Sequence, residues 1–253
     1  MAGDAGDDGG DRDDDGSAPG ADAEALRQAR RGRLRARPAA HAAPSAAVPP
    51  PGTRPLGLGG HRDGLLMVPP RAGGAGSLPL LVMLHGAGGG AGHALRLLEA
   101  QAREAGIALL APESRGATWD LILGGLGPDV AFLDAALRHA FAALPVDPGR
   151  LAIGGFSDGA SYALSLGLAN GDLFRRVLAF SPGFAAPPAT MGRPALYVSH
   201  GTADEVLPID RCSRRLVPRL QRAGYAVRYE EFEGGHVVPA GAVADALALL
   251  RAG

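Results

Sequence analysis

Lysine is absent from the chain, so all 25 of its lysine-or-arginine residues are arginines. Chemistry that needs a lysine amine, such as Schiff-base formation, is therefore excluded. Cysteine occurs once, at Cys212, so no intramolecular disulfide can form and nothing requires an oxidising compartment. Aromatic residues make up only 5% of the chain, while small and aliphatic residues are abundant, which suits a parallel sheet covered by small-residue helices.

Long apolar runs are missing as well. No stretch approaches the roughly 18 residues that a membrane-spanning helix needs, and the acidic, glycine-rich start lacks the basic and apolar regions of a signal peptide. We therefore expect a cytoplasmic protein without membrane insertion, with export by a route not written in this N-terminus as the alternative. The formal net charge of -1 gives no general attraction to nucleic acid, and the oligomeric state stays open.

Residues 1–52 differ in composition from the rest. Residues 3–16 are almost entirely glycine, alanine and aspartate, six arginines follow between Arg27 and Arg37, and an alanine- and proline-rich stretch ends at Pro51. Such segments usually stay disordered or extended, so we expect an acidic and then arginine- and proline-rich tail. The alternatives are an electrostatic docking segment for an anionic partner and a short helix over residues 22–35.

Residues 53–253 show short apolar runs alternating with longer helical patterns. This alternation predicts an α/β domain with a buried, mostly parallel sheet and helices on both faces. Ligands of such sheets bind beyond the carboxyl ends of the strands. The expected strands are 53–58, 64–68, 78–85, 107–111, 150–155, 176–180, 195–200 and 226–232, and the expected helices are 93–105, 130–143, 158–168, 209–222 and 240–252.

A Gly-x-Ser-x-Gly motif occupies Gly155–Gly159, after an apolar run and before a helical one. In that context a tight strand-to-helix turn projects the hydroxyl of Ser157 above the sheet, and the two glycines avoid clashes. A serine hydroxyl needs a base, and His236 follows the last expected strand. Asp204 follows the strand before it and is the expected acid, with Glu205 as its neighbouring competitor. The order Ser, Asp, His is the one expected for a nucleophile of this kind.

A glycine-rich loop follows the expected strand 78–85, at Gly86–Gly90. It lacks the Lys-Ser/Thr of a phosphate-binding loop and the glycine spacing of a dinucleotide site. It fits an oxyanion loop better, and we expect the backbone N–H groups of Ala87 and Asp158 to be the donors. One such donor stabilises a transition state by roughly 3 kcal/mol.

The motifs at 85–90, 155–159, 201–208 and 234–236 occur in order over about two hundred residues. Together they resemble the phospholipase/carboxylesterase-type branch of the α/β-hydrolases, and they are similar to dienelactone-hydrolase-like and polyhydroxybutyrate-depolymerase-like esterases. The stretches 127–134 and 145–148 are similar to those families too. The resemblance implies an α/β-hydrolase fold and ester hydrolysis through an acyl-enzyme, with no metal or organic cofactor. It departs from dienelactone hydrolase, where the nucleophile would be cysteine rather than Ser157.

Only residues 181–193 join the expected strands 176–180 and 195–200, which is too short for a lid domain. We therefore expect an open site for esters with short or exposed acyl groups. Candidate substrate-binding residues are Gly86, Trp119 and Phe156. Trp119 either contacts an apolar part of the substrate or packs against the sheet edge, and Phe156 can also face the core.

Three rival functions remain open at this point. A serine peptidase or amidase of the same fold usually has an additional recognition domain, and an acyltransferase differs only in using an alcohol in place of water. A non-catalytic binding protein on a hydrolase scaffold has no need for a complete set of serine, histidine and acid.

Overall fold

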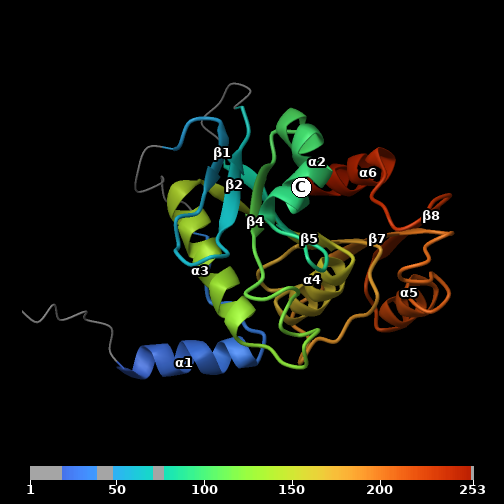
Figure 1. The fold of residues 1–253 in the computed structure, drawn as a ribbon, viewed down its shortest axis with the longest axis horizontal. Coiled ribbons are helices and arrows are strands. Elements are labelled where there is room, and N and C mark those ends of the chain that lie inside the picture. The colour runs from blue at the N-terminus through green and yellow to red at the C-terminus, as the bar shows by residue number, and fades with distance from the viewer. Residues whose placement is uncertain (1–18, 39–47, 71–76, 252–253) are drawn as a thin grey trace, which may run out of the picture.

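A computed structural model describes residues 19–38, 48–70 and 77–251. Its centre is an eight-stranded sheet with the strand order β1-β2-β4-β3-β5-β6-β7-β8, in which β1 and β2 run antiparallel to their neighbours and the remaining pairs are parallel (Figure 1). The strands are β1 (Gly52–Pro55), β2 (Gly64–Val68), β3 (Leu78–Leu84), β4 (Ala108–Pro112), β5 (Val146–Phe156), β6 (Arg176–Phe180), β7 (Ala195–Gly201) and β8 (Val227–Phe232). The mostly parallel sheet predicted from the sequence is confirmed.

Helices cover both faces of the sheet because its central strands are apolar on both sides. One buried cluster combines side chains of β3, β5 and β6 with those of α3 (Pro128–Ala143), α4 (Asp158–Ala169) and α5 (Ser213–Arg222). The other cluster combines the alternate side chains of the same strands with α2 (Ala91–Glu104) and α6 (Ala240–Arg251). The α/β architecture with helices on both faces is therefore confirmed.

Many boundaries differ from expectation by one to three residues, and the starts of two elements differ by four. Strand β5 begins at Val146 rather than at residue 150, because Val146 pairs with Leu78 across an irregularity in the register with β3. Helix α5 begins at Ser213 rather than at residue 209, because residues 209–212 form a separate hydrogen-bonded turn after Pro208. The segment between β6 and β7 contains no helix, in line with the short connection expected there.

The N-terminal segment departs from the expected disordered tail over residues 19–37. Helix α1 (Pro19–Arg30) packs against α3, and Ala29, Leu34 and Ala36 are buried in the same core cluster as α3 and α4. The short helix considered for residues 22–35 lies within this region. The rest of the predicted tail, residues 1–18 and 39–47, lies outside the described residues.

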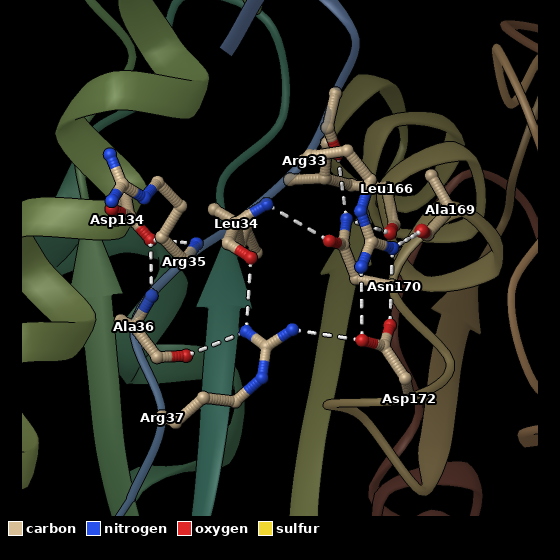
Figure 2. Close-up of polar contacts among 11 residues, drawn as sticks. Arg33, Leu34, Arg35, Ala36, Arg37, Asp134, Leu166, Ala169, Asn170 and Asp172 are labelled. Carbon is tan, nitrogen blue, oxygen red and sulfur yellow. Dashed lines mark hydrogen bonds and ion pairs between the residues drawn. The ribbon is translucent and has the colours of Figure 1, made fainter. Parts of the chain in front are cut away.

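Backbone N–H groups of residues 34–36 bind one side chain of α3 and one at the C-terminal end of α4 (Figure 2). The N–H of Leu34 donates to Asn170 Oδ1 at 2.9 Å, and the N–H groups of Arg35 and Ala36 donate to Asp134 Oδ1 at 2.6 and 2.7 Å. Buried amides must be paired, and here side chains replace a neighbouring strand as the acceptors. This arrangement carries no periodic signal in the sequence, which is why composition alone predicted disorder.

Candidate active site

The turn from β5 into α4 carries Ser157. Its backbone angles are φ 58° and ψ -121°, a left-handed conformation that a residue with a side chain rarely adopts. The N–H of Ser157 donates to Phe180 O at 3.0 Å, so pairing with β6 continues into the turn. The strained turn predicted for Gly155–Gly159 is present.

Close packing explains why glycines flank this serine. A methyl group on Gly155 would lie 2.2 Å from the carbonyl oxygen of Gly159, and one on Gly159 would lie 2.4 Å from Leu84 O. Both distances are shorter than any van der Waals contact, so the turn can close on itself at Gly155 and approach the end of β3 at Gly159 only without side chains.

A small part of Ser157 reaches the surface. The residue is 9% exposed, and its hydroxyl makes no hydrogen bond to any part of the chain that the structure describes. Gly86 lies opposite, where an added methyl group would be 3.3 Å from Ser157 Cβ. The hydroxyl is therefore reachable and unpaired.

Asp204 and His236 are in direct contact. His236 Nδ1 lies 2.6 Å from Asp204 Oδ2, and the amides of Val206 and Leu207 donate to Asp204 Oδ1 at 3.0 and 2.8 Å. Burial favours the protonated carboxyl, but the hydrogen bonds from His236 and Leu207 outweigh it and lower the pKa of Asp204. Glu205, the alternative acid, is exposed, so the structure brings Asp204 rather than Glu205 to His236.

Two loops and an aromatic ring position His236. The amide of Ala203 donates to Gly234 O at 2.9 Å, which joins the loop after β7 to the loop after β8. The ring of Phe156 lies 4.6 Å from the imidazole, centroid to centroid. Phe156 is 9% exposed and belongs to the core, so it packs beside His236 and links that residue to the neighbouring Ser157.

A second histidine reaches the same carboxylate. His200 is completely buried, with Nε2 2.8 Å from Leu207 O and 3.2 Å from Asp204 Oδ2. A carbonyl can only accept, so Nε2 carries the proton and Nδ1 accepts from the Ser213 hydroxyl at 2.6 Å. Burial is the main reason that the pKa of His200 is lowered. No sequence pattern indicated this contact of His200 with Asp204.

The glycine-rich loop after β3 turns sharply. Gly88 has φ 67°, and the amide of Gly89 donates to Gly86 O at 3.0 Å, a pattern typical of a type II turn. Within the described chain, neither the amide of Ala87 nor that of Asp158 donates a hydrogen bond. These are the two N–H groups expected to serve as oxyanion donors.

His85 supports that loop from below. The amide of Ser114 donates to His85 Nε2 at 3.0 Å, so Nδ1 carries the proton and donates to Gly86 O at 2.7 Å. Burial lowers the pKa of His85, which keeps the imidazole neutral and this pattern intact.

Trp119 does not line an opening. It is 0% exposed, its indole N–H donates to His85 O at 2.9 Å, and its ring stacks on Tyr162 at 5.0 Å. Of the two interpretations considered for Trp119, its complete burial favours packing over contact with substrate. The loop that carries it is held by Asp120, which accepts from the Tyr162 hydroxyl at 2.8 Å.

The structure thus gathers the expected residues at the carboxyl ends of four strands: Gly86 and Ala87 after β3, Ser157 after β5, Asp204 after β7 and His236 after β8. Among the described residues, no three histidine, cysteine or acidic side chains group as metal ligands would, and no helix is long and apolar enough to cross a bilayer.

The comparisons with known proteins agree with this fold. Residues 130–252 match the family model described as phospholipase/carboxylesterase. The chain is thus similar to esterases of the α/β-hydrolase fold. Over 114 residues it is 34% identical to a probable feruloyl esterase C of Aspergillus oryzae (strain ATCC 42149 / RIB 40). That match spans 45% of this chain and 41% of the relative's own length.

Solved structures share the fold of this chain at low sequence identity. Esterase PE8 superposes with a TM-score of 0.61 at 24% identity, over 74% of this chain and 97% of its own. A ferulic acid esterase from Anaeromyces mucronatus, solved with ferulic acid, gives a TM-score of 0.58 at 14% identity, over 83% of this chain and 92% of its own. An S-formylglutathione hydrolase from Staphylococcus aureus gives a TM-score of 0.61 at 17% identity, over 81% of this chain and 99% of its own.

Proposed function

We propose that this chain hydrolyses carboxylic esters through an acyl-enzyme on Ser157, with His236 as the base and Asp204 as the acid. The observation that carries the proposal is the 2.6 Å contact between His236 Nδ1 and Asp204 Oδ2, at the same sheet edge as a strained, unpaired serine. A buried carboxylate with a lowered pKa stays ionised, so it fixes the proton on Nδ1 and leaves Nε2 free to accept one.

In the first half of the reaction, Ser157 Oγ attacks the ester carbonyl carbon and His236 Nε2 takes its proton. The backbone amides of Ala87 and Asp158 receive the oxyanion, since both lack another acceptor in the described chain. The tetrahedral intermediate collapses, the alcohol leaves with the proton from His236, and the acyl group stays on Ser157.

Water completes the second half by the same route. His236 takes a proton from the water as its oxygen attacks the acyl carbon, and it then returns that proton to Ser157 as the acid departs. Asp204 keeps its negative charge throughout and stabilises the imidazolium in both halves.

The substrate class proposed is esters with short or exposed acyl groups. The connection between β6 and β7 contains no helix, so that connection adds no lid over the opening at Ser157. The similarity to a probable feruloyl esterase adds hydroxycinnamoyl esters to the substrates worth testing. Such an ester presents its carbonyl at the end of a flat, rigid acyl group, which an open site can admit.

Hydrolysis of p-nitrophenyl esters from acetate to palmitate, with methyl ferulate beside them, tests the proposal. We expect activity on the shortest acyl chains or on methyl ferulate, declining toward palmitate, and its loss in Ser157→Ala. Turnover that survives in Ser157→Ala would assign the nucleophile elsewhere. Equal inactivity of both proteins on every ester would favour the binding-protein alternative.

A further inference from the structure

A cavity of about 380 Å³ lies along α5, apart from the proposed catalytic residues. It opens between this helix and the segment that follows β6, and its volume is within the range of small-molecule sites. None of Ser157, Asp204 and His236 lines it. A molecule bound in this cavity would therefore not contact the proposed catalytic residues.

Three arginines line one side of the cavity. Arg211, Arg215 and Arg219 follow one another at intervals of four residues, so they lie along one face of the α5 region. None of their side chains makes an ion pair or hydrogen bond within the described chain, whereas Arg214 pairs with Asp210 and Glu231. The cavity is thus flanked by positive charge that lacks a counterion among the described residues.

Much of the remaining lining is apolar. It includes leucine and aromatic side chains from α4, α5 and the segments beside them: Leu168, Phe184, Leu216, Leu220 and Tyr225. Phe184 is 37% exposed, so an apolar ligand can bury part of its ring. A ligand that satisfies both kinds of lining must combine an anionic group with an apolar body.

We propose that this cavity binds a small amphiphilic carboxylate, such as the anion of a medium-chain fatty acid. Guanidinium groups recognise carboxylates through paired, charge-assisted hydrogen bonds, and the apolar chain would cover the exposed face of Phe184. Lysine and histidine are absent from the lining, so binding does not depend on a group that loses its charge near neutral pH. The site is independent of ester hydrolysis.

Isothermal titration with sodium octanoate tests the proposal on the full-length protein. We expect one site per chain, and affinity about tenfold lower in Arg215→Gln and in Arg219→Gln, because each variant removes charge-assisted hydrogen bonds. Arg222→Gln is the matched control: Arg222 lies on the same helix and does not line the cavity, so affinity should stay within about twofold. Sodium acetate, with equal charge and no chain, should bind at least about tenfold more weakly.

Absence of octanoate binding would overturn the proposal. Equal affinity in the Arg215→Gln/Arg219→Gln double variant, or an equal loss in Arg222→Gln, would also overturn it, because the bound anion would then lie elsewhere. The titration needs no turnover, so its result is separate from that of the ester assay. Unchanged melting temperatures of the variants establish that the exposed arginines were replaced without unfolding.

Discussion

At the scale of single residues, Gly155 and Gly159 are required because neighbouring backbone atoms lie too close for a side chain, and not only because glycine is flexible. In Gly155→Ala the new methyl group would meet the carbonyl oxygen of Gly159 at 2.2 Å, so the turn into α4 must move. We expect the free energy of unfolding to fall by about 3 kcal/mol, the upper part of the range for overpacking, with loss of esterase activity. Urea denaturation measures the change.

Gly241→Ala is the control for that experiment. Gly241 lies in α6 with nothing within 4 Å of an added methyl group, so alanine should leave stability unchanged or raise it by up to about 1 kcal/mol. If Gly155→Ala were tolerated as well as Gly241→Ala, the account of the turn would be wrong.

His200 is a positioning residue at this scale. Its Nε2–H lies between Leu207 O and Asp204 Oδ2 and so helps to hold the carboxylate against His236. In His200→Gln we expect kcat to fall about tenfold with KM unchanged, because a hydrogen bond to a charged group contributes about 1.5 kcal/mol. In an Asp204→Asn background the same change should have almost no further effect. Equal, additive losses in both backgrounds would indicate a purely structural role.

The residues of the proposed site were predictable because each follows a recognisable strand. Ser157 directly follows an apolar strand, Asp204 and His236 lie a few residues beyond β7 and β8, and parallel strands bring their carboxyl ends to one edge. The contact of His200 with Asp204 was not predictable, because it depends on the bend of the loop 201–208. The burial of Trp119 was left open for a similar reason: composition does not reveal that His85 O would accept its indole N–H.

At the scale of elements, the central strands were predicted almost residue by residue, and β2 and β6 match their predicted bounds. The length and apolar content of a sequence run predict such strands, since both of their faces are buried. Residues 33–37 have neither signal. Their attachment depends on side chains of α3 and α4 that lie far away in the sequence, so no local pattern could indicate it.

Asn170 gives the sharpest test of that attachment. Its amide accepts from Leu34 N–H and donates to Gly32 O at 2.7 Å and to Leu166 O at 2.9 Å, all buried. Asn170→Ala leaves these groups unpaired, so we expect the free energy of unfolding to fall by about 2–3 kcal/mol. Thermal denaturation monitored by circular dichroism measures the change.

Arg27→Gln is the comparison within the same segment. Among the described residues Arg27 pairs only with Glu24, on the surface of α1, so its replacement should leave the melting temperature unchanged. If Asn170→Ala had no more effect than Arg27→Gln, residues 33–37 would not be attached as described.

At the scale of the whole molecule, two fully buried histidines make stability depend on pH. Burial lowers the pKa of both His85 and His200 in the folded state, so below about pH 6.5 the unfolded chain binds more protons than the folded one. Stability should therefore fall as the pH is lowered from 7 toward 5, by up to about 1.4 kcal/mol per pH unit for each histidine. Asp204, with its lowered pKa, adds to the loss only near and below about pH 4.

Urea denaturation between pH 7.5 and 5 measures this dependence, and His200→Gln should make it shallower. A stability that stays constant or rises as the pH falls would contradict the neutral, buried state of the two imidazoles.

The central claim is that Ser157 is the nucleophile, and covalent labelling tests it most directly. Intact-protein mass spectrometry after treatment with a fluorophosphonate should show one adduct per chain, which peptide mapping places on Ser157 and which is absent from Ser157→Ala. Asp204→Asn should still be labelled, but slowly, because its imidazole is no longer held by a carboxylate. An adduct on another residue, or labelling that persists in Ser157→Ala, would contradict the account.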